Sequence, residues 1–200
     1  AGLFIKRLWD VVLSAALIIV LTPLWIVLPV LIWSEDRGPV FFRQTRVGLD
    51  GHEFRIWKFR TMRVNADAEL TALLARQGTS DRPLFKVDND PRITRLGRFL
   101  RRTSLDELPQ LFNVFRGTMS LVGPRPQVPE EVELYDDTAA RRLLIKPGMT
   151  GLWQVNGRSS LTWEEALRFD LFYVENWALS MDIRILFRTL RVVLAREGSV

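Results

Sequence analysis

Residues 11–34 read VVLSAALIIVLTPLWIVLPVLIWS and carry no charged side chain. An apolar segment of roughly two dozen residues is long enough to cross a bilayer as a helix. Pro23 and Pro29 interrupt it, and a proline inside a helix removes a hydrogen bond and clashes with the preceding turn. The Thr22 hydroxyl can bind a carbonyl that Pro23 leaves unpaired, which makes a break tolerable at membrane depth. The segment predicts a membrane-associated N-terminus that is broken at Thr22 and Pro23.

Two arrangements of this segment remain open. Basic residues flank both of its ends, namely Lys6, Arg7, Arg37, Arg43 and Arg46. The positive-inside tendency places both ends on the cytoplasmic face, which predicts a re-entrant helix-break-helix hairpin over residues 1–36. A kinked transmembrane helix fits the prolines equally well. A cleaved signal peptide fits poorly, because the apolar stretch is too long and no small-residue cleavage site precedes its exit.

The composition limits which residue types could carry out catalysis. The 200 residues include 28 Lys and Arg against 23 Asp and Glu, and the net charge of +5 favours an anionic partner. Cysteine is absent, and His52 is the only histidine, so disulfides, thiolate metal sites and His-rich clusters are excluded. His52 follows Asp50-Gly51, where a turn is favoured over a catalytic role. Catalysis must therefore rest on carboxylates, Lys, Arg, Tyr or hydroxyls.

Residues 37–200 are predicted to form a mainly helical α+β domain on the cytoplasmic face. Residues 39–47 and 54–62 alternate as two strands joined through Asp50-Gly51, a strong hairpin signal, with Lys58 and Arg60 on one face. Periodicity and composition predict a helix over 66–77, a polar loop over 78–90, two helices within 94–115 that meet at an N-cap Ser104, a charged helix over 130–144, a glycine-containing loop over 146–158 and a helix over 182–196.

The helix over 182–196 is basic on one face. Arg184, Arg188 and Arg191 share that face, and apolar side chains surround the rest. Such an amphipathic helix suits a lipid headgroup interface. Packing on the protein's own core is the commoner role of such helices, but the upstream apolar segment favours the interface.

The candidate reactive segment is residues 103–109, TSLDELP. Ser104 followed by Glu107 has the spacing of a capping box, which explains the acids without any catalysis. A cationic cluster precedes them, namely Arg92, Arg95, Arg98, Arg101 and Arg102. These cations and a helix N-terminus would keep Asp106 ionised, as an attacking carboxylate must be. Asp106 is therefore a candidate nucleophile, and Glu107 lies beside it.

A second candidate site is the segment Gly123-Pro124-Arg125-Pro126. The two prolines restrict the backbone around Arg125, so its guanidinium could bind a diphosphate with little loss of freedom. A rigid loop with a solvated arginine explains the same residues. Neither a Walker-type loop nor a Rossmann glycine motif is present, so phosphates would be bound by Arg, Lys, backbone amides and a metal.

The chain resembles the bacterial sugar transferases, the monotopic phosphoglycosyl transferases that start glycan assembly on undecaprenyl phosphate. The matching stretches are residues 58–62 (KFRTM), 90–92 (DPR), 103–111 (TSLDELPQL), 119–126 (MSLVGPRP), 146–155 (KPGMTGLWQV) and 170–177 (DLFYVENW). The resemblance implies a membrane-dipping helix broken at a proline. It also implies a two-step reaction, in which Asp106 takes a phosphosugar from a UDP-sugar, releases UMP, and passes the phosphosugar to a polyprenyl phosphate.

The resemblance also implies roles for other residues and partners. Glu107 would assist with magnesium or with activation of the acceptor, and Mg²⁺ would be held by Asp106 and Glu107 with substrate phosphate oxygens. The candidate substrate-binding and phosphate-binding residues are Lys58, Arg60, Arg102, Arg125, Arg158 and Asp170. The loop over 146–158 is most similar to larger exopolysaccharide- or capsule-initiating members that use UDP-glucose or UDP-galactose and carry extra transmembrane helices upstream. The implied location is the bacterial inner membrane, and an oligomer is possible.

Two other functions compete with this one. A non-enzymatic module that binds anionic lipid or a partner protein explains the apolar segment and the charge, but it gives no reason for acids among the cations. Nucleic-acid binding is not expected, because the most basic helix is strongly apolar on its other side and the chain carries a bilayer-length segment.

Overall fold

The structure of the chain, a computed structural model, describes residues 2–64, 66, 90–157 and 161–195. Within that part it is mainly helical with two two-stranded sheets, which agrees with the predicted α+β class. The elements are α1 (Gly2–Val20), α2 (Thr22–Asp36), β1 (Phe41–Val47), β2 (Glu53–Phe59), α4 (Arg95–Thr103), α5 (Gln110–Arg116), β3 (Ser120–Val122), α6 (Pro129–Val132), α7 (Asp137–Ala140), β4 (Gly148–Thr150), α8 (Trp163–Asn176) and α9 (Leu179–Ala195). The predicted helix over 66–77 and loop over 78–90 lie outside the described residues, apart from their end positions.

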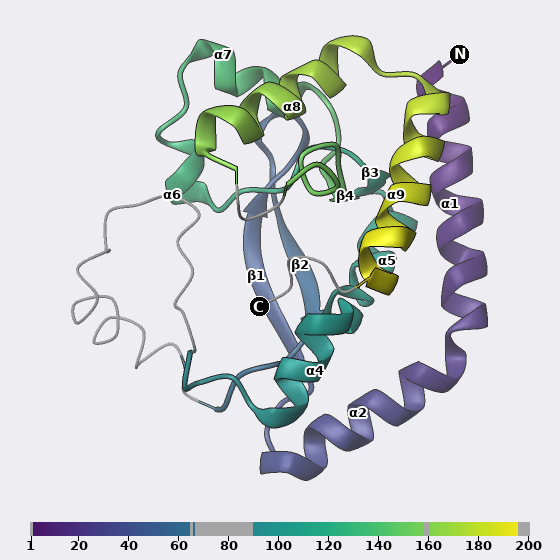
Figure 1. Ribbon diagram of the computed structural model, residues 1–200, viewed down its shortest axis with the longest axis vertical. Helices are drawn as coiled ribbons and strands as arrows, with labels where there is room; N and C mark the ends of the chain where they lie inside the picture. Colours follow the sequence, from purple (N-terminus) through teal and green to yellow (C-terminus); the bar gives the residue numbers. More distant parts are fainter. Residues whose placement is uncertain (1, 65, 67–89, 158–160, 196–200) are drawn as a thin grey trace.

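Helices α1 and α2 form a bent arm along one edge of the molecule (Figure 1). They meet at a bend of 63°. The Thr22 hydroxyl donates to the carbonyl of Ile19 at 2.6 Å, as the sequence predicted, whereas Pro29 stays inside α2. None of the described helices has, by itself, the length and apolarity of a membrane span, and α1 and α2 reach both only when they are counted together.

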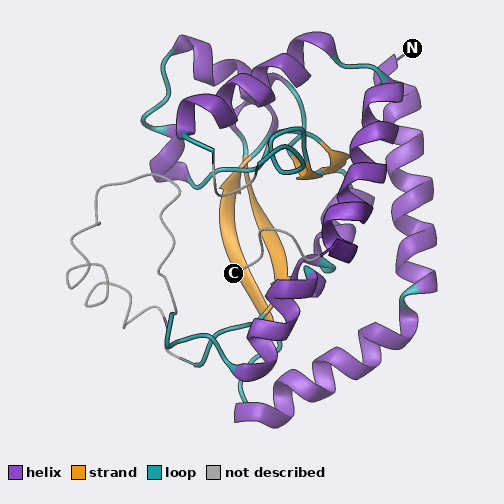
Figure 2. Cartoon of the chain, viewed as in Figure 1, coloured by secondary structure: helices purple, strands orange, loops and turns teal. Residues whose placement is uncertain are grey.

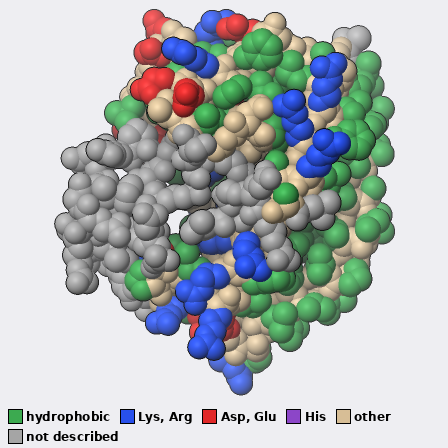
Figure 3. Space-filling view, in the orientation of Figure 1, with side chains coloured by type: hydrophobic (Ala, Val, Ile, Leu, Met, Phe, Trp, Pro, Cys, Tyr) green, Lys and Arg blue, Asp and Glu red, His purple; other side chains and the backbone are tan. Residues whose placement is uncertain are grey.

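The arm buries both polar and apolar side chains on its inner side and exposes apolar side chains on its outer side. Lys6, Asp10 and Ser14 follow one another at helical spacing and are 9%, 3% and 0% exposed. The large apolar side chains exposed on the arm are Leu3, Phe4, Ile5, Leu8, Trp9, Val12, Ile19, Val20, Ile26, Val27, Val30, Leu31 and Trp33. Figure 3 shows this continuous hydrophobic edge. Leu28 and Ile32 of α2 pack in the core, so the arm differs from a helix on the surface of a soluble protein in its apolar exposed side and in the buried polar residues of α1.

The hairpin of β1 and β2 lies at the centre, with helices around it (Figure 2). The strands pair antiparallel from Phe41 opposite Phe59 to Val47 opposite Glu53. The turn passes through Asp50 and Gly51 at φ 55° and 79°, as predicted, and glycine tolerates that conformation. The backbone amide of His52 donates to the Leu49 carbonyl at 3.1 Å and its side chain is exposed, which agrees with the turn role.

Ser104 does not cap a helix, contrary to the prediction. It ends α4 in the left-handed conformation, φ 56°, and its side chain makes no capping bond. A short 3-10 turn, Leu105–Glu107, follows, and α5 begins only after Pro109. The reason is the proline, which lacks an amide hydrogen and is tolerated at the start of α5 but not within it. Helix α5 ends at Gly117, whose φ of 93° is the left-handed conformation that glycine tolerates.

The predicted helix over 130–144 is wrong as a single element. The segment divides into α6, α7 and a 3-10 turn, Arg141–Leu144. Asp136 starts α7 by accepting a hydrogen bond from the amide of Ala139 at 2.7 Å, so the chain changes direction in the middle of the segment. The short parallel pairing of β3 with β4 was not predicted, because three residues carry too little alternation to be recognised.

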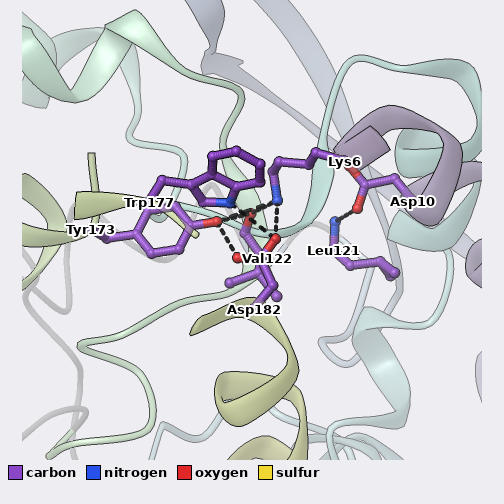
Figure 4. Close-up of polar contacts among 7 residues, drawn as sticks. All are labelled: Lys6, Asp10, Leu121, Val122, Tyr173, Trp177 and Asp182. Carbon is purple, nitrogen blue, oxygen red and sulfur yellow. Dashed lines mark hydrogen bonds and ion pairs between the residues drawn. The ribbon is translucent and has the colours of Figure 1, made fainter. Parts of the chain in front are cut away.

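Helix α9 begins at Leu179, three residues before the predicted start, and places Asp182 inside the protein at 1% exposure. Figure 4 shows Asp182 in a buried network with Lys6 and Tyr173. Lys6 Nζ lies 2.6 Å from Asp182 Oδ2, and both Lys6 and the Tyr173 hydroxyl bind the Val122 carbonyl, at 3.1 and 3.0 Å. Asp10 accepts from the Leu121 amide at 3.0 Å. Side chains of α1 therefore hold the backbone that immediately precedes Gly123.

Candidate active site

Asp106 and Glu107 lie on the 3-10 turn between α4 and α5. The left-handed Ser104 reverses the chain before them and turns Asp106 inward, to 8% exposure. Glu107 is more open, and its Oε1 lies 2.7 Å from Lys58 Nζ on β2. The structure thus brings three predicted site residues, Asp106, Glu107 and Lys58, into one cluster.

The surroundings of the Asp106 carboxyl shift its pKa in opposite directions. Burial raises its pKa to about 6, and the adjacent Glu107 acts in the same direction, while Lys58 and Arg101 lower it. The expected stabilisation of the carboxylate by cations is therefore present, but burial outweighs it. At pH 7 the carboxylate is still the major form, poorly solvated and close to a lysine.

The arginines before the turn do not act as one cluster. Arg92 forms a buried ion pair with Asp90, 2.6 Å between Nη2 and Oδ2. Arg101 donates to the Thr61 hydroxyl at 2.9 Å, and its charge lowers the pKa of Asp106. The exposed members are Arg95, Arg98 and Arg102. Arg102, a predicted phosphate ligand, thus lies on the exposed side of α4, whereas Arg101, which was predicted only as a member of the cationic cluster, acts on Asp106.

Arg60 has a partner away from the acidic turn. It follows β2 and pairs with Asp36 at the end of α2, whereas Lys58 pairs with Glu107. Arg60 therefore connects the strand to the arm, and among the predicted strand cations it is Lys58 that reaches the acids.

The loop of Gly123, Pro124, Arg125 and Pro126 is fixed by backbone contacts. The Pro124 carbonyl accepts from the Gly148 amide at 2.8 Å. The Arg125 carbonyl accepts from Arg142 at 3.3 Å, and the Arg125 guanidinium lies 5.7 Å from the ring centre of Trp153. A side-chain cation is thus presented from a rigid loop, as the sequence predicted for Arg125.

Asp170 lies in α8 and is 1% exposed. Its Oδ2 is 2.5 Å from Arg142 Nη2. Burial raises the pKa of Asp170 to about 6, although Arg142 lowers it. Asp170 therefore supports the loop through Arg142. Arg158, another predicted ligand, lies outside the described residues.

Sequence reasoning missed Arg142 and Arg46. Arg142 binds Asp170, the Arg125 carbonyl and the Tyr135 hydroxyl, the last at 2.6 Å. Arg46 is the penultimate residue of β1 and donates to the Pro126 carbonyl at 3.1 Å. Neither belongs to a local motif, because each acquires its partners only when distant segments meet; the alternation of β1 at most places Arg46 and Gln44 on one face.

The acidic turn offers few side-chain ligands for a divalent cation. Among the described residues no group of three or more His, Cys, Asp and Glu side chains could hold a metal. Asp106 and Glu107 supply two carboxylates, one of which is partly engaged by Lys58. Magnesium is commonly bound by one or two carboxylates with the remaining positions filled by water and substrate phosphates, so this donor set fits it.

Comparison with known proteins shows which family the chain matches. The profile of the family described as Bacterial sugar transferase matches residues 1–196. The undecaprenyl-phosphate galactose phosphotransferase of Salmonella typhimurium is 49% identical over 98% of this chain and 42% of its own length. The UDP-galactose-lipid carrier transferase of Erwinia amylovora is 47% identical, with the same two coverages of 98% and 42%. The exopolysaccharide production protein ExoY of Sinorhizobium fredii is 42% identical over 97% of this chain and 87% of its own length.

The chain therefore spans less than half of the first two relatives and most of the third. The family profile covers nearly all of it and includes every described site residue. The chain belongs to the bacterial sugar transferase family.

Proposed function

We propose that this chain transfers a sugar-1-phosphate from a UDP-sugar to a polyprenyl phosphate, with Asp106 as the nucleophile. The observation that carries the proposal is a buried carboxylate beside Glu107, Lys58 and Arg101, in a chain of this family. A helix-capping acid is normally solvated, whereas Asp106 is desolvated next to cations. That environment suits a nucleophile that must meet a phosphate.

The reaction proceeds in two displacements. A carboxylate oxygen of Asp106 attacks the sugar-bearing phosphorus, the bond from that phosphorus to the bridging oxygen breaks, and UMP leaves with the bonding electrons. The phosphosugar remains on Asp106 as an acyl phosphate. An oxygen of the polyprenyl phosphate then attacks the same phosphorus, giving the polyprenyl diphosphate sugar and restoring the carboxylate. Because UMP departs first, the two anionic substrates need not share the site.

The surrounding residues have separable tasks. Lys58 neutralises Glu107 and lies near Asp106, so it can bind a phosphoryl oxygen as that oxygen approaches. Arg125 presents a fixed guanidinium to the diphosphate. Magnesium, held by Asp106 and Glu107, would offset phosphate charge when bound.

The relatives suggest the sugar and the pathway. The names of the Salmonella and Erwinia proteins refer to galactose, and a 38% identical protein of Klebsiella pneumoniae is a UDP-glucose:undecaprenyl-phosphate glucose-1-phosphate transferase. We therefore propose UDP-galactose or UDP-glucose as donor and undecaprenyl phosphate as acceptor. The product would begin a bacterial exopolysaccharide, capsule or O-antigen at the cytoplasmic face of the inner membrane.

The arm of α1 and α2 is proposed to be a re-entrant hairpin. Its outward side chains are apolar and its buried ones include Lys6 and Asp10, which suits a lipid environment outside and a polar protein interior. Helix α9 exposes Arg184, Arg188 and Arg191 together with Phe187 and Leu190, a combination suited to headgroups. Figure 3 shows basic side chains over α9 beside the hydrophobic edge.

The hairpin predicts the sidedness of its two ends. The chain has no cysteine, so single variants Ala1→Cys and Asp50→Cys can be labelled cleanly with a membrane-impermeant maleimide. In sealed inverted vesicles both variants should react, and in right-side-out vesicles neither should react. Labelling of the two positions from opposite sides would instead establish a transmembrane helix.

The pKa of Asp106 predicts an acidic limb in the rate. The attacking carboxylate must be ionised, and its pKa is about 6 because burial raises it. The value of kcat/KM for UMP release should therefore be flat above pH 7 and fall about tenfold per pH unit well below pH 6. Asp170 has a similar pKa, so Asp170→Asn is the control. The limb should persist in that variant, and its disappearance would assign the titration to Asp170 instead.

The decisive experiment is a search for the covalent intermediate. The membrane-inserted protein is incubated with magnesium and a panel of UDP-sugars without acceptor, and its intact mass is measured. An increase equal to one phosphosugar is expected with UDP-galactose or UDP-glucose, and the adduct should be lost when polyprenyl phosphate is added. Membrane binding without an adduct or any UMP release from any donor would favour a non-enzymatic surface module.

A further inference from the structure

Arg46 is a largely buried cation without an acidic partner. It lies at the end of β1, where Nη1 donates to the Pro126 carbonyl at 3.1 Å and Nη2 to Gln44 Oε1 at 2.7 Å. Its Nε is buried and has no hydrogen-bond partner. In the part of the chain that the structure describes, no carboxylate oxygen lies within ion-pair distance of it. The other buried arginines, Arg92 and Arg142, are each paired with an aspartate.

The position of Arg46 links the two halves of the candidate site. Its pKa is lowered to about 10, mainly by burial and next by the nearby positive charge of Arg125. The negative charges of Glu107, Glu130 and Glu131 raise the pKa of Arg46. The Arg46 guanidinium therefore lies within electrostatic range of both the acidic turn and the Arg125 loop. It remains protonated at physiological pH.

Two cations within electrostatic range of each other, one of them largely buried, favour an anion between them. Burial of an unpaired guanidinium beside a second one is costly, and a bound phosphate reduces the cost of both. A donor such as the buried Nε, which has no partner within the protein, can be satisfied by the same ligand. The planar fork of arginine also suits two oxygens of one phosphate.

We propose that Arg46 binds the phosphate of the UMP portion of the nucleotide sugar, opposite Arg125, and stabilises the charge that this phosphate gains when UMP leaves. The inference rests on the proposed function, because it assigns a ligand within that site. Each phosphate then has its own ligands. Lys58 and the acidic turn bind the transferred phosphoryl group, and Arg46 and Arg125 bind the phosphate of the departing UMP.

A purely structural role for Arg46 makes a different prediction. If Arg46 only held the Pro126 carbonyl, its loss would act through the loop that carries Arg125, so it should not weaken UMP further in a variant that already lacks the Arg125 guanidinium. If Arg46 contacts the phosphate, its loss should weaken UMP in the Arg125→Gln background as well and leave uridine unaffected. The UMP affinity of Arg46→Gln/Arg125→Gln relative to that of Arg125→Gln therefore separates the two roles.

The experiment is calorimetric titration of UMP and of uridine into the membrane-inserted protein, its Arg46→Gln and Arg125→Gln variants and the variant that carries both changes. On loss of Arg46, UMP affinity should fall about tenfold or more, as for loss of a hydrogen bond to a charged group, with uridine affinity unchanged. Arg43→Gln is the matched control, because it removes one charge from the exposed side of the same strand, where Arg43 stacks on Trp57. It should leave both affinities unchanged.

Parallel weakening of UMP and uridine, or no weakening of either, would overturn the inference. Arg46→Lys keeps the positive charge but lacks the planar guanidinium, and it replaces the glutamine variant if that variant does not fold. In Arg46→Lys, UMP should bind at least about threefold more weakly than in the wild type, and uridine should bind equally well. Unchanged UMP binding in that variant also counts against the proposal. The covalent adduct of the wild type tests the proposed function separately. If the adduct forms but Arg46→Gln leaves the ratio of UMP affinity to uridine affinity unchanged, only the role of Arg46 is refuted. If that ratio changes but no adduct forms, the transfer reaction is refuted.

Discussion

Replacing Asp106 with Asn is expected to reduce UMP release by about three orders of magnitude or more and to abolish the phosphosugar adduct. An amide of the same shape cannot attack phosphorus, and no other described carboxylate is both buried and adjacent to Lys58. The measurement is UMP release per enzyme from UDP-galactose or UDP-glucose, with intact mass after each reaction. Asp136→Asn is the matched control, because Asp136 is an exposed N-cap and asparagine caps equally well.

The same variant separates loss of chemistry from loss of fold. The pKa of Asp106 is raised above the model-peptide range to about 6, so the folded state binds more protons than the unfolded state between roughly pH 4 and pH 6. Stability from this group is therefore present at low pH and is lost as pH rises through 6. At pH 7.5 the neutral asparagine should leave the midpoint of thermal unfolding unchanged or higher. Retained turnover in a folded variant would remove the proposed mechanism.

The features that the sequence predicted well are local. The break at Thr22 and Pro23 and the turn at Asp50 and Gly51 depend on residues within a few positions of each other, so the backbone rules suffice. Asp106, Glu107 and Lys58 were found because a short motif and a family resemblance marked them, and the structure gathers them. The location of the arm in lipid stays a prediction.

Some features were missed because they depend on partners distant in sequence, and others because two local signals compete. Lys6 was interpreted as a charge flanking the membrane segment, but it is buried against Asp182, 176 positions away. Ser104 has the composition of an N-cap, yet the following Pro109 delays the helix and leaves Ser104 as the end of α4. The arginines before the turn were treated as one cluster, and the sequence did not show that Arg92 pairs with the nearby Asp90 whereas Arg101 acts on Asp106.

The second large effect is expected at the pair of Arg142 and Asp170. Their side chains are 4% and 1% exposed, and Arg142 also binds the Tyr135 hydroxyl. Arg142→Met fills the space but leaves a buried carboxyl without its cation, which should cost about 3–5 kcal/mol of unfolding free energy. For a chain of this size that corresponds to a fall of roughly 6–20 °C in the unfolding midpoint, measured by a thermal scan in detergent.

The double variant Arg142→Met/Asp170→Leu divides the two roles of the pair. Replacing both charges with apolar side chains removes the uncompensated carboxyl, so most of the lost stability should return. Activity should not return, because the donor to the Arg125 carbonyl is still missing and the loop that presents the Arg125 guanidinium has lost a support. A double variant that recovers stability and UMP release together would mean that the pair only fills the core. Recovery of stability alone would show that a buried ion pair, expensive to desolvate, is kept to aim the phosphate-binding loop.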